Sequence, residues 1–220
     1  MSMVATMICL ERMGYDMFYP WIRFGKETTH SDEFLSTAGD ICEALQPMAV
    51  ECLIKEILEM WGRQGRLFVI GIGGSAANAS HAVNDFRKLC NIEAYCPSDN
   101  IAEFSARTND EGWDTAFSGW LKVSKLNDKD ALLILSVGGG SKKENVSWPI
   151  IRAVDLALNR GARVLGIVGK ADGHVAEHGH VVIVIPSSKK WLTPMAESFQ
   201  SLILHCVVSH PDLQMNKTKW

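Results

Sequence analysis

Apolar residues recur at intervals of three, four and seven between about residues 31 and 64, which predicts helical structure. The periodic positions are Phe34, Leu35, Ile41, Leu45, Met48, Cys52, Ile57 and Met60. Pro47 interrupts this segment and predicts two helices rather than one. Residues 1–30 contain the aromatic run MFYPWIRF but no clear period. We expect them to form an N-terminal extension of undefined role that docks on the body or on a neighbouring subunit.

Beyond residue 65 the pattern changes to short apolar runs that end in turns. RLFVIGIGG, ALLILSVGGGS, RVLGIVGK and HVVIVIP predict strands, and NIEAYCP predicts a further one. Amphipathic segments predict helices at about 76–89, 144–159 and 194–209. Wholly apolar strands that alternate with helices are typical of a parallel sheet covered on both faces. We therefore expect an α/β protein: a three-layer α/β/α sandwich with helical additions at its N-terminus, in which residues 31–220 form one domain.

Composition narrows the classes of partner. A length of 220 residues suits one domain, and 47% hydrophobic residues suit a globular protein. The net charge of −3 offers no basic surface for nucleic acid, so we expect no such partner. No apolar run approaches the length of a membrane span, and the N-terminus lacks the pattern of a signal peptide. The six cysteines are irregularly spaced without C-x-x-C, which favours buried thiols in a reducing cytoplasm.

Two glycine-rich turns follow predicted strands, at Gly71 to Ser75 and at Ser136 to Ser141. Ligands of open parallel sheets lie beyond the carboxyl ends of the strands, where such turns present backbone N–H groups to anions. Either turn alone could serve only to reverse the chain tightly. The pair, with its serine hydroxyls, favours a site for a phosphate-sized anion.

A dinucleotide site is the alternative for the first turn, because GIGGSA satisfies the G-x-G-x-x-G/A spacing. Such a site needs an acidic residue near the end of the second strand to bind the ribose. Glu93 has the right separation but lies at the start of that strand. NAD-dependent chemistry therefore remains a minor alternative.

Two pairs of ionisable residues lie on helices. His81 and Asp85 are four residues apart on the helix after the first turn, a spacing used by metal ligands or by an acid and its orienting partner. An exposed surface pair would have the same spacing. Glu197 and His205 interrupt the apolar last helix, where we expect polar partners on its packed side. Their separation spans about 12 Å on a straight helix, which strains any site that contains both.

These segments together resemble the sugar isomerase (SIS) domain family, and within it the bacterial phosphoheptose isomerases that act on sedoheptulose 7-phosphate. The resemblance covers about residues 31–210 and is carried by GIGGSAANASHAVND, TNDEGWD, SVGGGS and AESFQSLILHCVV. It implies a five-stranded parallel sheet of flavodoxin-like type and a homotetramer with active sites between subunits.

The resemblance also implies roles for individual residues. The family's phosphate-binding serines match Ser75, Ser136 and Ser141, and its substrate-contacting aspartate matches Asp110. Its histidine ligand and its glutamate base match His81 and Asp85. Its glutamine ligand and its histidine acid match Glu197 and His205.

Departures from the family pattern concern the particular sugar more than the phosphate. Asp85 is one methylene shorter than the usual glutamate, and Glu197 adds a negative charge in place of glutamine. Ile72 replaces a polar asparagine. The second turn is longer and lacks hydroxyls at Val137 and Gly138. We expect a divergent branch of the family.

The expected activity is interconversion of a ketose phosphate and an aldose phosphate through an enediol, with Asp85 as base and His205 as acid. Zn²⁺ bound by His81, Asp85, Glu197 and His205 would polarise the carbonyl. If all four bound the ion at once, none would be free as a base. The phosphate would contact the three serines and the backbone of the glycines, namely Gly73, Gly74, Gly138 and Gly139. Glu197 is expected beside the substrate as well.

Two further hypotheses stay open. A non-catalytic SIS-domain protein that binds a sugar phosphate or another protein is compatible with the altered base and the longer turn. His174, His178 and His180 lie in DGHVAEHGH, which invites a metal interpretation. We interpret this stretch instead as a surface turn and short helix that leads into a strand.

Overall fold

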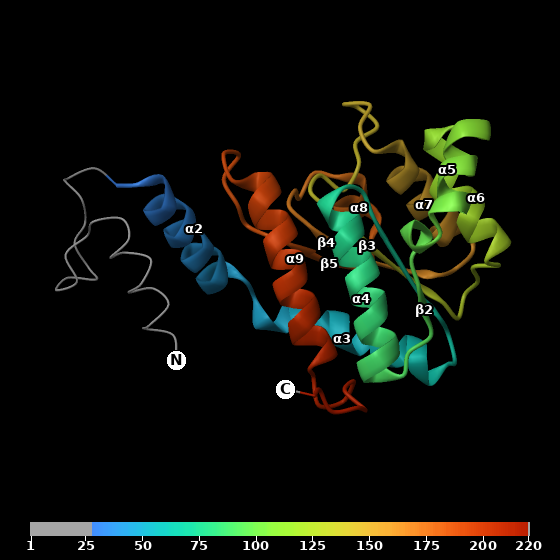
Figure 1. The fold of residues 1–220 in the computed structure, drawn as a ribbon, viewed down its shortest axis with the longest axis horizontal. Coiled ribbons are helices and arrows are strands. Elements are labelled where there is room, and N and C mark those ends of the chain that lie inside the picture. Colours follow the sequence, from blue (N-terminus) through green and yellow to red (C-terminus); the bar gives the residue numbers. More distant parts are fainter. Residues whose placement is uncertain (1–27, 220) are drawn as a thin grey trace. The chain divides into compact units, whose positions relative to one another are not determined.

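The computed structural model describes residues 28–219, and Figure 1 shows its ribbon. The chain divides into two compact units between Gly39 and Asp40, within helix α2 (His30–Ala44). The expectation for residues 1–30 falls almost wholly outside the described residues and stays a prediction. The second unit contains the sheet.

The break predicted at Pro47 is confirmed. Helix α2 ends at Ala44, and α3 (Pro47–Gly62) begins at the proline itself. Proline suits the first turn of a helix because the N–H that it lacks would have no intrahelical acceptor there.

Five parallel strands form one sheet in the order β2-β1-β3-β4-β5. The strands are β1 (Leu67–Gly71), β2 (Ala94–Tyr95), β3 (Ala131–Ser136), β4 (Arg163–Val168) and β5 (Val181–Val184). Every residue of β1 and β3 is buried. The continuous apolar runs in the sequence therefore reflect strands covered on both faces. The predicted five-stranded parallel sheet is confirmed.

Helices cover the two faces of this sheet. The helices and helical turns beyond α3 are α4 (Gly74–Cys90), η1 (Pro97–Asp99), α5 (Ile101–Asp110), η2 (Trp113–Thr115), α6 (Ala116–Val123), α7 (Trp148–Asn159), α8 (His174–His178) and α9 (Leu192–Val208). Buried side chains of α6, α7 and α8 form one core cluster with alternate residues of the strands. Helix α4 contacts β1 and β3, α9 contacts β3 and β4, and α3 contacts β5 and α9. The predicted three-layer α/β/α sandwich is confirmed, and α4 and α9 lie side by side in it (Figure 1).

The helix predicted from about residue 144 begins later, at Trp148. Residues 141–146 instead form a small hairpin, in which Ser141 and Val146 exchange two backbone hydrogen bonds of 3.0 Å. Asn145 and Ser147 both have φ of 57°, which a right-handed helix does not allow. Helices α5 and α6 were not predicted from the sequence pattern.

Of the cysteines in the described part of the chain, only Cys90 and Cys96 are buried, while Cys42, Cys52 and Cys206 are exposed. The expectation of buried thiols therefore holds for two residues. Burial raises the pKa of Cys90 to about 11, so this thiol stays protonated at neutral pH. Among residues 28–219, no helix combines the length and apolar character needed to cross a bilayer.

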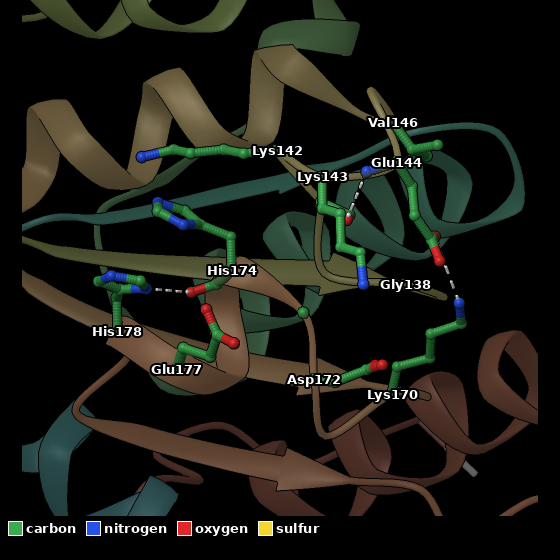
Figure 2. A pocket seen from close by; sticks show the side chains of 13 residues that line it. Gly138, Lys142, Lys143, Glu144, Val146, Lys170, Asp172, His174, Glu177 and His178 are labelled. Carbon is green, nitrogen blue, oxygen red and sulfur yellow. Dashed lines mark hydrogen bonds and ion pairs between the residues drawn. The ribbon is translucent and has the colours of Figure 1, made fainter.

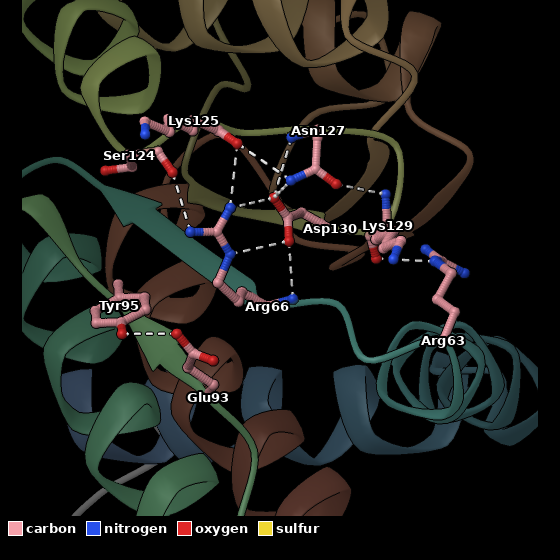
Figure 3. Close-up of polar contacts among 9 residues, drawn as sticks. All are labelled: Arg63, Arg66, Glu93, Tyr95, Ser124, Lys125, Asn127, Lys129 and Asp130. Atoms are coloured by element: carbon pink, nitrogen blue, oxygen red, sulfur yellow. Dashed lines mark hydrogen bonds and ion pairs between the residues drawn. The ribbon is translucent and has the colours of Figure 1, made fainter.

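A buried ion pair fixes the amino ends of β1 and β3 (Figure 3). The side chain of Arg66 donates to Asp130 Oδ1 at 3.2 Å and to Oδ2 at 2.8 Å, and its backbone N–H donates to Oδ1 at 2.9 Å. The backbone N–H of Asn127 donates to Oδ2 at 3.0 Å. The hydrogen bonds that Arg66 donates to Asp130 raise the pKa of Arg66. Because the Asp130 side chain is only 2% exposed, its charge depends on these donors rather than on water.

Asp130→Ala is expected to lower the free energy of unfolding by about 3 kcal/mol, because it removes the acceptor of several buried donors. Urea denaturation followed by circular dichroism measures this. Asp128→Ala is the control, since Asp128 is exposed two residues earlier and its loss should change stability by less than about 0.5 kcal/mol. Equal effects of the two substitutions would contradict the assigned role of Asp130.

Candidate functional site

The first glycine turn leads directly from β1 into α4. A β-carbon at Gly71 would collide with the carbonyl oxygen of Ser75, so only glycine allows the helix to start this close to the strand. Gly73 has φ of 65° and precedes the helix. The first N–H groups of a helix lack intrahelical acceptors and attract anions. The Ser75 side chain at this point is 1% exposed, and its Oγ has no hydrogen-bond partner among the described residues.

The second turn lies beside the first, because the last pair of the β1–β3 register joins Gly71 to Leu135. Ser136 Oγ accepts a hydrogen bond of 3.0 Å from the N–H of Gly139. Ser141 Oγ accepts one of 3.1 Å from the N–H of Glu144. Both hydroxyls thus shape the turn, and each keeps its O–H to donate to a ligand. The N–H of Gly139, expected to bind phosphate, is occupied by Ser136.

Three of the four predicted catalytic residues meet between α4 and α9. Asp85 Oδ2 lies 3.2 Å from His81 Nε2 and 3.6 Å from His205 Nδ1. The imidazole rings of His81 and His205 meet edge to face, with an interplanar angle of 72° and centroids 5.1 Å apart. Two imidazole nitrogens and a carboxylate oxygen within 4.8 Å of one another are ligands that Zn²⁺ accepts. The group therefore fits a metal as well as acid–base chemistry.

This group is open to solvent in the single chain. The side chains of His81 and His205 are 53% and 56% exposed, and that of Asp85 is 14% exposed. His205 thus has the expected polar partner on the neighbouring helix, namely Asp85, but its side chain is exposed rather than buried. Leu202, one turn earlier on α9, is also exposed. A site of this kind needs a cover that excludes water, and the described chain does not supply it.

Glu197 lies apart from these three residues. A β-carbon at Gly74 would collide with the Glu197 carboxylate, which places that carboxylate at the N-terminus of α4. It does not belong to the ligand group of His81, Asp85 and His205 in residues 28–219. The eight-residue step from Glu197 to His205 corresponds to about 12 Å of helix, which explains the separation. One chain does not assemble the predicted four-ligand zinc site.

Asp110 is the last residue of α5, where its exposed carboxylate accepts a hydrogen bond of 2.7 Å from Asn109. It belongs neither to the cluster of His81 nor to the lining of the cleft described below.

Glu93 lies just before β2, and the register pairs Leu67 at the start of β1 with Ala94. The Glu93 carboxylate accepts a hydrogen bond of 2.8 Å from Tyr95 Oη (Figure 3). It lies near Arg66, at the opposite end of β1 from the glycine turn. A dinucleotide ribose held beyond the carboxyl end of β1 would not reach it. The geometry thus weighs against the dinucleotide alternative.

A cleft of about 580 Å³ lies on the other side of the second turn, toward α8 (Figure 2). Its lining includes Gly138, Gly140, Ser141, Lys142, Lys143, Lys170, His174, Glu177 and His178. Gly138 and Ser141, which we expected to bind the phosphate, line this cleft, whereas we had interpreted the histidines as surface residues. The available signal was the spacing of HVAEH, which places both histidines and the glutamate on one turn of helix.

Helix α8 confirms the predicted short helix before a strand. The interpretation as surface is wrong for His174, which is buried. Burial lowers the pKa of this histidine, although the hydrogen bond with Asp155 acts in the opposite direction. His180 is also held in the fold, because its Nδ1 accepts a hydrogen bond of 2.9 Å from the N–H of Val164.

Comparisons with known proteins agree with this architecture. No protein-family model matches the chain. The lincomycin biosynthesis protein LmbN of Streptomyces lincolnensis is 32% identical over 190 residues, covering 80% of this chain and 67% of that protein. The phosphoheptose isomerase of a Nitratiruptor species is 32% identical over 158 residues, covering 69% of this chain and 79% of that enzyme.

Solved structures share the fold. Phosphoheptose isomerase GmhA from Neisseria gonorrhoeae superposes with a TM-score of 0.70 at 22% identity, covering 81% of this chain and 94% of that one. A phosphoheptose isomerase from Francisella tularensis superposes with a TM-score of 0.69 at 20% identity, covering 82% and 97%. The sequence identity to the curated enzymes and the fold shared with the solved structures lead to one assignment. The chain belongs to the sugar isomerase (SIS) domain family, among the phosphosugar isomerases close to phosphoheptose isomerase.

Proposed function

We propose that this phosphosugar isomerase interconverts a ketose phosphate and an aldose phosphate, with a substrate similar to sedoheptulose 7-phosphate. The observation that carries the proposal is the meeting of His205 on α9 with His81 and Asp85 on α4, the helix that begins at the first glycine turn. The seven-residue step from Gly74 to His81 corresponds to about 10 Å along the helix, comparable to an extended sugar phosphate. A phosphate at the start of α4 would therefore place its reacting carbons beside the histidines.

The phosphate end would be bound by the first turns of two elements. The free N–H groups at the start of α4 and the hydroxyl of Ser75 face an anion at this position. Ser136 and Ser141 can each donate an O–H from the second turn. Binding energy at the phosphate holds the reacting carbons in place, which is a large part of catalysis for a small substrate.

The reaction needs one group that removes a proton and one that returns it. Asp85 acts as the base in our proposal, because its Oδ2 lies between the imidazoles of His81 and His205. Its Oδ1 accepts a hydrogen bond of 2.9 Å from Asn84 Nδ2. His205 donates a proton to the oxygen of the developing enediol. A divalent metal such as Zn²⁺ would polarise the carbonyl, with His81, Asp85 and His205 as its ligands. Ligation would have to loosen during turnover for Asp85 and His205 to transfer protons. Glu197 lies at the start of α4 rather than at this centre.

A second copy of the chain would complete the site. The exposure of His81, His205 and Leu202 leaves the reacting centre uncovered in one chain. Isomerisation through an enediol benefits from exclusion of water, which otherwise competes for protons. We therefore propose a homotetramer in the cytoplasm with active sites between subunits.

Asp85→Asn should lower kcat by a factor of about 10² or more, because the amide cannot accept the substrate proton. Binding of the sugar phosphate, measured by calorimetry, should stay within a few-fold of wild type. Turnover is measured as ketose–aldose interconversion of sedoheptulose 7-phosphate. Asp128→Asn, at an exposed aspartate in the turn before β3, is the control and should retain full activity. Turnover by the Asp85 variant at the wild-type rate would refute the assignment of the base.

Ser75→Ala tests the phosphate site through two effects of opposite sign. Removal of an unpartnered buried hydroxyl should leave the free energy of unfolding unchanged or raise it by about 1 kcal/mol. Loss of a hydrogen bond to a charged phosphate should raise KM by about ten-fold or more. Urea denaturation and steady-state kinetics measure the two effects.

Ser118→Ala is the matched control for Ser75. Ser118 is also buried, but its Oγ donates 3.1 Å to the carbonyl of Thr115. This substitution should destabilise the protein and leave KM unchanged. An unchanged KM in the Ser75 variant would remove Ser75 from the phosphate site.

A further inference from the structure

Helix α8 carries a second group of metal ligands that the isomerase mechanism does not use. One nitrogen of His174, one of His178 and one carboxylate oxygen of Glu177 lie within 4.8 Å of one another. The histidines are four residues apart on one helical turn, and their ring centroids are 4.1 Å apart. We propose that these three residues bind a divalent transition metal of the zinc type at the wall of the cleft in Figure 2.

The hydrogen bonds of both imidazoles leave a lone pair for the ion. His174 Nε2 lies 2.7 Å from Asp155 Oδ1. A carboxylate oxygen has no proton to donate, so it can only accept. His178 Nδ1 lies 2.9 Å from the carbonyl oxygen of His174, which also can only accept. Each ring therefore carries its proton on the nitrogen named, and the other nitrogen is unprotonated. Carboxylate and carbonyl acceptors orient metal-binding histidines in this way.

The position of the group leaves the ion accessible. His178 and Glu177 are exposed and line the cleft of about 580 Å³, whereas His174 is buried behind them. Two of the neighbouring lysines have carboxylate partners: Lys142 lies 3.4 Å from Asp155, and Lys170 lies 3.8 Å from Glu144. Their charges are thus partly offset near the proposed ion. Three protein ligands leave a fourth position of a tetrahedral ion open toward the cleft.

The site is tied to the second glycine turn. The backbone N–H of His174 donates a hydrogen bond of 2.8 Å to the carbonyl of Gly140. The backbone N–H of Val175 donates one of 3.0 Å to the carbonyl of Gly139. An ion that holds the α8 side chains together would therefore stabilise the turn on which α8 rests. This group lies in the layer of α6 and α7, whereas His81, Asp85 and His205 lie in the layer of α4 and α9. The two groups can be tested independently.

The experiment uses the full chain with His81→Ala and His205→Ala, which removes the other ligand group. This protein should bind one Zn²⁺ per chain in competition with a chelating dye, and Zn²⁺ should raise its Tm. Addition of His178→Ala or Glu177→Gln should weaken binding, with the histidine change costing more than about a hundred-fold. His210→Ala, at a histidine outside both groups, is the control.

Asp155→Asn tests the orienting hydrogen bond separately. It should weaken Zn²⁺ binding by about ten- to a hundred-fold, because outer partners of ligating histidines contribute to that extent. Lys142→Met is its matched control, since it removes the other partner of Asp155 and leaves the bond to His174. Absence of Zn²⁺ binding in the starting variant would overturn the proposal. Equal affinities for the Asp155 and Lys142 variants, or no effect of Glu177→Gln, would do the same.

Discussion

The parallel register of β1 and β3 is the constraint on which the proposed site depends. Five consecutive pairs run from Leu67 with Ala131 to Gly71 with Leu135, so both strands end at the same level. The glycine turns that follow are neighbours for that reason alone. At the opposite end, the buried pair of Arg66 and Asp130 holds the two strands at their start. A slip of one residue would reverse which side chains face each layer and would separate the two turns.

Helices α4 and α9 then divide the chemistry of the site. Helix α4 contributes an anion-binding N-terminus and, two turns later, His81 and Asp85 on one face. Helix α9 packs alongside and contributes Glu197 near the first end and His205 near the second. The same two helices thus present a phosphate end and a reacting end at a separation set by helical rise. This arrangement explains how a small set of side chains could position a long polar substrate.

The second glycine turn is shared by two environments. Toward β1 it faces the proposed phosphate site, and toward β4 it supports α8 through the carbonyls of Gly139 and Gly140. Its serine hydroxyls are engaged with its own backbone, which makes the turn a defined structure rather than a loose loop. A ligand bound to α8 would therefore affect the second glycine turn, which borders both the proposed phosphate site and the cleft. The hairpin at 141–146 lines the cleft.

Local patterns in the sequence determined the strands, the two turns and the pairing of His81 with Asp85. Each of these depends on spacing within one element, where the period of a strand or helix fixes which side chains share a face. The start of α7 was misplaced because the positive φ of Asn145 and Ser147 has no signal in hydrophobic periodicity. Helices α5 and α6 were missed in a segment that the resemblance, rather than a periodic pattern, had singled out.

Tertiary structure alone decided which elements meet. It brought His205 to Asp85 and left Glu197 at the start of α4, because the packing of α9 on α4 sets their relative translation. It also buried His174 against Asp155, which lies on a helix nineteen residues away in the chain. Contacts between distant segments arise from the packing of whole layers on the sheet. Such contacts cannot be predicted from the spacing of residues within one segment.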